Sequence, residues 1–172
     1  MSWVLEGRVW NVGDDVQHDA DMISIQVMRD AERDPEVLAR MLFADRFPEL
    51  TANARPGDVV VAGKRFAHGN PHNEGWIALR ERGMGVVCRS IARGSYRNAI
   101  GAASRLLVGP APLSEVAATG QGIRVDFAAG LVELDSGERF EYPPFPPELQ
   151  QIVADGGMEP WIRARLAERS GA

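Results

Sequence analysis

The chain has 172 residues, 45% of them hydrophobic and 25% charged, which is enough for one domain with a sizeable core and short for two. Its 19 lysines and arginines are dispersed among 24 aspartates and glutamates, and the formal charge is -5, so we expect neither nucleic acid nor an anionic membrane surface as a partner. The first ten residues include Glu6 and match neither a signal peptide nor an anchor, and no apolar run approaches membrane-spanning length. We therefore expect a cytoplasmic protein with a single domain over residues 1–172.

The first third of the chain predicts a strand, a loop and a helix. Residues 3–13 alternate apolar and polar side chains, as a strand entering a turn does. Residues 14–22 are acidic and have neither helical nor strand periodicity, so we predict a loop. Asp34 and Pro35 precede apolar residues at helical spacing, which predicts a capped helix that ends before Pro48.

The middle of the chain predicts a parallel sheet. Short apolar runs within 56–63, 85–91 and 105–109 have the pattern of strands buried on both faces, and helical patterns at 74–83 and 95–104 separate them. Strands that alternate with helices in this way are typical of an α/β fold with right-handed crossovers.

The last third changes character. Residues 122–146 alternate apolar and polar side chains around the turn sequence at 135–137, which predicts two or three antiparallel strands. Residues 146–172 carry apolar residues at helical spacing on both sides of Gly156 and Gly157, where we expect the helical pattern to break.

Polar side chains gather in the loop after the strand within 56–63. Because ligands collect at the carboxyl ends of parallel strands, we interpret this loop as a candidate active site. Its histidines can exchange protons near neutral pH, and the helix expected to begin between Pro71 and Glu74 would direct free N–H groups toward an anion, which suggests a small carboxylate substrate. Asn70 and Pro71 can equally be an ordinary helix cap. The candidate side chains are His68, Asn70, His72, Asn73 and Glu74.

Three other sets of side chains are weaker candidates for a metal or catalytic site. The carboxylates and His18 within 14–29 allow a divalent cation, although acidic runs are usually solvated turns. His68 and His72 lack a third nearby ligand, so we predict no metal site in this chain. Cys88 lies within a buried-strand pattern, where a thiol usually acts as a small apolar residue. A single cysteine also excludes a self-contained iron–sulfur site, so another chain must hold any cluster.

Three segments resemble a known family. "GRVWNVGDDVQHDADMI", "GDVVVAGKRFAHG" and "VVCRSIARGSYRNAI" are similar to the small subunits of isopropylmalate isomerase, the swivelling domain of the aconitase family. The resemblance runs from Gly7 to about Leu107, and "TGQGIRVDFAAGLVEL" and "ADGGM" fit the family's closing hairpin and helix. It implies a three-layer aconitase swivelling-domain fold, with a mainly parallel central sheet and a C-terminal β-hairpin and helix. It also implies closure over a separate large subunit, in which three cysteines bind a [4Fe–4S] cluster.

The sequence departs from the family at its active-site loop. The family has two serines, an arginine, a glutamate and a histidine there, the first serine being the catalytic base and the arginine a carboxylate ligand. The corresponding residues here are Asn70, Pro71, His72, Asn73 and Glu74. Asparagine cannot accept a proton as an activated serine does, so we expect His72 to act as the replacement base or, when protonated, as the carboxylate ligand.

The resemblance also assigns residues in the first loop. The family's threonine–aspartate pair falls on His18 and Asp19, and its substrate-binding arginine on Arg29. We therefore expect His72 and Asn70 to be catalytic, and the substrate to be bound by His68, Asn73, Arg29, His18 and Asp19.

Three hypotheses remain open from the sequence. The leading one is the small subunit of a divergent aconitase-type hydro-lyase, which dehydrates, hydrates or isomerises a hydroxy-carboxylate together with an iron–sulfur large subunit. The alternative is a non-catalytic binding or regulatory partner with the same fold. The third is a stand-alone enzyme that uses the histidines without iron.

Overall fold

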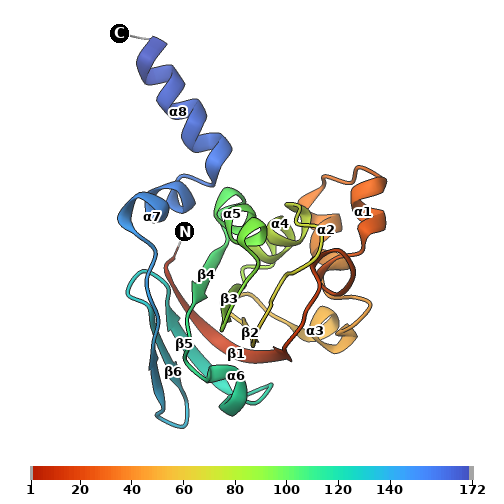
Figure 1. Cartoon of the computed structure of the whole chain (residues 1–172), viewed down its shortest axis with the longest axis vertical. Coiled ribbons are helices and arrows are strands. Elements are labelled where there is room, and N and C mark those ends of the chain that lie inside the picture. Colours follow the sequence, from red (N-terminus) through yellow and green to blue (C-terminus); the bar gives the residue numbers. More distant parts are fainter. Residues whose placement is uncertain (1, 171–172) are drawn as a thin grey trace.

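One curled sheet runs through the chain, which the computed structural model describes over residues 2–170. Within these residues the sheet has seven strands in the order β4-β3-β2-β1-β5-β6-β7 (Figure 1). Neighbouring strands from β4 to β1 are parallel, whereas those from β1 to β7 are antiparallel. The strands are β1 (Val4–Gly13), β2 (Val59–Ala62), β3 (Gly85–Cys88), β4 (Arg105–Val108), β5 (Gly122–Asp126), β6 (Leu131–Leu134) and β7 (Arg139–Glu141).

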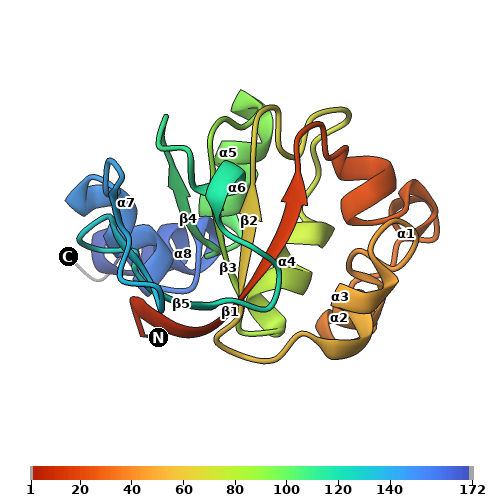
Figure 2. The same cartoon turned by 90° about the horizontal axis from the view of Figure 1, so that it is seen from below.

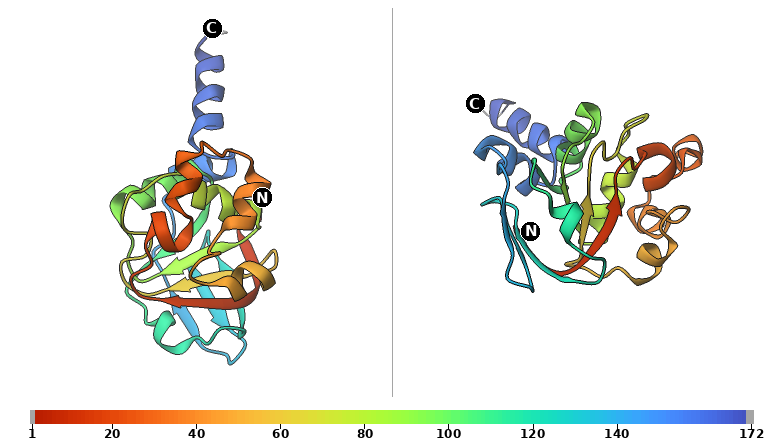
Figure 3. Two further views of the ribbon diagram at one scale, coloured as in Figure 1. Left: turned by 90° about the vertical axis from the view of Figure 1, so that its right-hand side faces the viewer. Right: turned by 60° about the horizontal axis from the view of Figure 1, so that its bottom comes forward.

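Strand β1 belongs to both halves of the sheet. Residues 4–8 pair with β5, and the part from Val9 onward pairs with β2, with an irregularity between Asn11 and Gly13. Because a long strand twists along its length, the two halves of the sheet do not lie in one plane. Figures 2 and 3 show β5 and β6 turned away from the plane of the parallel strands.

The helices lie mainly on one side of the parallel strands, as Figure 2 shows. The described helical segments are the π-helical turn η1 (His18–Met22), α1 (Ile25–Arg29), α2 (Pro35–Met41), α3 (Pro48–Asn53), α4 (Glu74–Glu81), α5 (Arg93–Gly101), α6 (Leu113–Val116), α7 (Pro147–Ala154) and α8 (Met158–Ser170).

Side chains of the parallel strands alternate between two cores. Val60, Val86 and Leu106 face the larger core, which they share with the helices. Val59 and Val87 face a second core formed with α6, β5 and β6. The structure therefore has three layers. The helices form the first, the parallel strands form the second, and strands β5 and β6 with α6 form the third. This arrangement confirms the three-layer α/β fold, the mainly parallel sheet, and the C-terminal hairpin and helix.

The helix boundaries correct several predictions. Segment 14–22, predicted as a loop, contains η1, and α1 was not predicted. The helix predicted to run from Pro35 to just before Pro48 ends at Met41, and Pro48 begins α3 instead of only ending a helix. Proline is suited to the first turn of a helix because the N–H that it lacks would have no intrahelical partner there.

The start of α4 also decides between two interpretations of the polar loop. This helix begins at Glu74, so Asn70 is too far from it to be its N-cap. Asn73 occupies the N-cap position and makes no side-chain capping hydrogen bond. The interpretation of Asn70 and Pro71 as an ordinary helix cap is therefore wrong.

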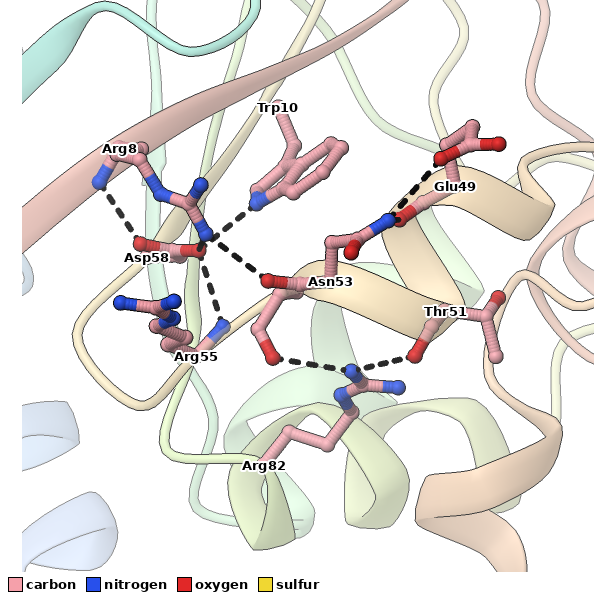
Figure 4. Close-up of polar contacts among 9 residues, drawn as sticks. Arg8, Trp10, Glu49, Thr51, Asn53, Arg55, Asp58 and Arg82 are labelled. Carbon is pink, nitrogen blue, oxygen red and sulfur yellow. Dashed lines mark hydrogen bonds and ion pairs between the residues drawn. The ribbon is translucent and has the colours of Figure 1, made fainter.

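A network of polar contacts lies just before β2, at the end of that strand away from the polar loop (Figure 4). The buried Asp58 carboxylate accepts hydrogen bonds from the N–H groups of Arg8 (2.8 Å) and Arg55 (3.0 Å) and from Trp10 Nε1 (2.9 Å), and lies 3.2 Å from Arg8 Nη2. Arg82 donates hydrogen bonds to two carbonyls at the end of α3. Burial raises the pKa of Asp58, but the hydrogen bonds and the Arg8 charge more than offset it, so the pKa lies below its ordinary value.

Helix α8 stands apart from the body of the molecule. It follows α7 after the predicted break at Gly156 and Gly157, and it projects beyond the other helices (Figures 1 and 3). None of the helices within residues 2–170 combines the length and the apolar composition that a membrane span requires.

Candidate active site

The loops that follow β1, β2 and β3 lie side by side. Gln17 and His68 form an isolated parallel bridge, in which the His18 N–H donates to the His68 carbonyl at 2.7 Å. Phe66 and Ile91 form a second bridge between the loops after β2 and β3. The polar loop is therefore held between two neighbours at the carboxyl edge of the parallel strands, where the sequence predicted a site.

A buried ion-pair network lies at the end of the polar loop. His72 Nδ1 is 2.7 Å from Oε2 of Glu74, the first residue of α4. The other oxygen of Glu74 accepts a hydrogen bond from Arg33 Nη1, which also donates to the Glu32 carbonyl at 2.8 Å. Only 7% of the Glu74 side chain and 8% of the His72 side chain are exposed, against 62% of Arg33. A carboxylate at this position is also stabilised by the positive end of the helix dipole.

His18 lies behind this network. Its ring packs edge-on against His72, with the centroids 4.4 Å apart, and its centroid is 6.1 Å from that of Trp76. Burial is the main cause that lowers the pKa of His18 to about 3; His72 acts in the same direction and Asp19 opposes it. The imidazole is consequently neutral at physiological pH. Among the described residues, both His18 ring nitrogens, His72 Nε2 and Trp76 Nε1 are buried without a hydrogen-bond partner.

A cleft of about 450 Å³ opens beside His72. It offers an imidazole backed by a carboxylate, an exposed guanidinium, and two amides, which together suit proton exchange next to a bound anion. The lining residues are Met28, Arg33, Pro71, His72, Asn73, Glu74, Ile77 and Asn98.

The sequence-predicted residues are only partly brought together. His72 and Asn73 line the cleft, whereas His18 is buried behind it. Arg29 is exposed at the end of α1 and does not line the cleft. Asn70 is exposed beyond the cleft lining, and His68 is half-buried and hydrogen-bonded to the first loop through its backbone.

Asp19 ties the first loop to the polar loop. Gln17 Nε2 donates to its carboxylate at 2.8 Å. Burial raises the pKa of Asp19, but hydrogen bonds from Gln17, from its own N–H and from the Asn70 N–H lower it below its ordinary value. Gly69 has φ +98°, a conformation that favours glycine, and a Cβ there would lie 2.6 Å from Asp19 Oδ1. Asp19 therefore fixes the loop geometry in this structure.

Arg33 and Asn98 are the residues that sequence reasoning missed, and Glu74 received no role. Arg33 meets Glu74 across 41 positions of sequence, so no local pattern identifies the pair. Glu74 did carry a signal, because it lies two residues after His72 and a carboxylate often orients an imidazole through a hydrogen bond.

The residues of this chain do not fit an iron–sulfur cluster. Cys88 is its only cysteine, and burial raises the pKa of that thiol, which disfavours the thiolate that a cluster requires. Over residues 2–170, no group of three or more histidine, cysteine, aspartate or glutamate side chains is placed to hold a metal ion.

Comparison with known proteins identifies the family. No protein-family model matches the sequence. The chain is 40% identical over 165 residues to the 3-isopropylmalate dehydratase small subunit 1 of Methanopyrus kandleri, with 95% of each chain covered. It is 33% identical over 172 residues to the 3-isopropylmalate dehydratase small subunit of Aquifex aeolicus, with 98% of this chain and all of that relative covered. The chain belongs to the 3-isopropylmalate dehydratase small-subunit family.

A solved structure supports the same assignment. The chain superposes with a TM-score of 0.86 on the crystal structure of 3-isopropylmalate dehydratase from Methanocaldococcus jannaschii, at 26% identity and with 98% of both chains covered. The family predicted from the sequence is therefore confirmed. A 3-isopropylmalate dehydratase small subunit is one component of a hydro-lyase, and its designation implies a large-subunit partner.

Proposed function

We propose that the chain closes over a [4Fe–4S]-containing large subunit of an aconitase-type hydro-lyase, and that His72 replaces the family's serine as the proton-transfer group. The substrate that we propose is a hydroxy-carboxylate, and the proposed location is the cytoplasm. The observation that carries this proposal is the buried His72–Glu74 contact of 2.7 Å at the wall of a cleft that also holds a guanidinium.

We propose different roles for the two His72 nitrogens. Glu74 occupies Nδ1, so the hydrogen bond favours the tautomer with the proton on Nδ1 and leaves Nε2 to accept a proton. Nε2 is buried in the isolated chain. Proton exchange with a substrate therefore requires Nε2 to become accessible while Nδ1 stays on Glu74, and we place that exposure at the closure of the two subunits over the substrate.

The other residues of the cleft bind and orient. Arg33 uses Nη1 for Glu74 and Glu32, so its contact with Glu74 holds the guanidinium at the rim of the cleft. Asn73 and Asn98 offer amide donors and acceptors to a hydroxyl or carboxylate. The cluster of the large subunit supplies a Lewis acid for the hydroxyl group that leaves or enters.

The closest competitor is a non-catalytic partner with the same fold. Two observations favour it: Asn70 stands where the family has its serine, and His72 Nε2 is buried. Such a chain would bind the large subunit without completing the reaction.

Reconstitution separates these two functions. The chain and its cognate large subunit are purified anaerobically and mixed, and enoate absorbance is followed across a panel of hydroxy-acids and unsaturated acids. We expect turnover that needs both chains and an intact cluster. A stable, cluster-loaded complex that is inert toward the whole panel would favour the non-catalytic partner, and failure to associate would contradict both functions.

A further inference from the structure

Helix α8 carries three exposed large apolar side chains, Met158, Ile162 and Leu166, which we call the apolar stripe. Met158 and Ile162 are spaced four residues apart, so they lie on one face of the helix, and 38% and 43% of their surface is exposed. Leu166 continues the same spacing and is 56% exposed. Large apolar side chains gathered on one face indicate a surface that another molecule covers.

The stripe borders a groove between α8 and the body of the molecule. The groove has a volume of about 520 Å³ and contains Ile77 and Arg80 of α4 on one side and Met158 and Ile162 of α8 on the other. Figure 1 shows α8 starting next to α5 and α7 and projecting beyond the other helices.

The groove is continuous with the candidate active-site cleft. Asn73 and Ile77 line both the groove and the cleft beside His72. Any molecule that covers the cleft from this side therefore also reaches the groove.

We propose that this groove, with the stripe on α8, is a docking site for the large subunit. The inference rests on the proposed function, in which the large subunit must bring its cluster to the cleft. This chain has one cysteine and it is buried, so the iron must approach from the partner, and the partner must cover the rim where Asn73 lies. A second copy of this chain in the groove would occupy the same rim and obstruct that approach.

The charges of α8 indicate the chemistry of the matching surface. The helix carries Arg163, Arg165 and Arg169 against Glu159 and Glu168, although the whole chain has a formal charge of -5. Arg163 already pairs with Glu159 within the helix at 2.7 Å, so we expect the matching surface of the large subunit to be an apolar ridge with carboxylates opposite Arg165 and Arg169.

The test places the same charge on opposite faces of α8. Ile162→Glu introduces a carboxylate into the groove, and Ala167→Glu is the matched control on the exposed far face. The affinity of each full-length variant for the cluster-loaded large subunit is measured by anaerobic titration calorimetry. We expect Ile162→Glu to weaken binding by about tenfold or more, and Ala167→Glu to change it by less than about twofold.

Further measurements make each outcome decisive. Circular dichroism and the melting temperature establish that both variants fold, and Ile162→Ala, which removes contact without adding charge, is expected to weaken binding by a few fold. Equal binding by wild type and a folded Ile162→Glu would overturn the docking site and leave the proposed function standing. Failure of the wild type to bind the large subunit would instead overturn the proposed function. A dimer of the chain alone that Ile162→Glu dissociates, seen by light scattering, would assign the groove to a second copy and overturn the inference.

Discussion

Among single residues, the proposed proton transfer depends on Glu74, whose carboxylate holds the His72 ring in place. Removing the charge from Glu74 while keeping its shape weakens the hydrogen bond to Nδ1 and the contact with Arg33. We expect Glu74→Gln to lower kcat of the reconstituted enzyme by about tenfold to a hundredfold, because a charge-assisted hydrogen bond contributes about 1.5–3 kcal/mol. The exposed Glu81→Gln on the same helix is the matched control.

A changed pH profile would separate this positioning role from a purely structural one. If Glu74 only stabilised the fold, Glu74→Gln would lower the melting temperature and leave the pH dependence of kcat unchanged. Wild-type kcat in a folded Glu74→Gln variant would refute the positioning role.

The buried His18 makes stability depend on pH. Its pKa is lowered to about 3 in the folded chain, mainly by burial, whereas an unfolded histidine titrates near 6.5. The unfolded chain therefore binds more protons between these values, and the free energy of unfolding should fall as pH decreases below about 6.5, by up to about 1.4 kcal/mol per pH unit. Urea unfolding from pH 7 to pH 4.5 measures this slope. His18→Leu should flatten it, and an equally steep slope in that variant would show that other groups cause it.

Among the elements, the contacts of Asp58 join β1 to the turn between α3 and β2. Asp58→Ala leaves the Trp10 Nε1 and two backbone N–H groups without their acceptor, so we expect a loss of about 2–4 kcal/mol in the free energy of unfolding. Because the pKa of Asp58 is lowered, its stabilisation is present above the ordinary carboxyl pKa and is lost as pH falls through the folded value. Urea unfolding at pH 7 measures the effect, with the exposed Asp45→Ala as control. Equal stability of the two variants would contradict the role of this network.

The helices and strands that were predicted correctly are those with a local sequence pattern of their own. The four parallel strands and α4 were predicted because each carries its own apolar pattern. The break at Gly156 and Gly157 was predicted because two adjacent glycines interrupt the helical pattern, and both residues have positive φ in the structure. The turn η1 was missed because part of its support is tertiary: the hydrogen bond from His18 to the His68 carbonyl comes from a distant loop. The short helix α3 was missed because Pro48 was interpreted only as a stop signal.

For the whole molecule, the strand order of the sheet determines which loops meet at the candidate site. Parallel pairing of β1, β2 and β3 brings their three following loops together, and this much follows from strand order. Two features depend on the path of the segment between β1 and β2, which no sequence pattern specifies. They are the packing of His18 against His72 and the ion pair between Arg33 and Glu74. The sequence could thus predict that these loops meet at the candidate site, but not which residues contact His72 there.

The most direct test of His72 as the proton-transfer group is the turnover of the His72→Ala variant in the assembled complex. The variant and the wild type are each reconstituted with the cluster-loaded large subunit, their equal association is verified by titration, and kcat/KM is measured on the best substrate of the panel. We predict that His72→Ala binds the large subunit normally and loses about a hundredfold or more of kcat/KM, as expected for removal of a general acid–base group. Unchanged kcat/KM in a normally assembled His72→Ala complex would contradict the assignment of His72 as the proton-transfer group.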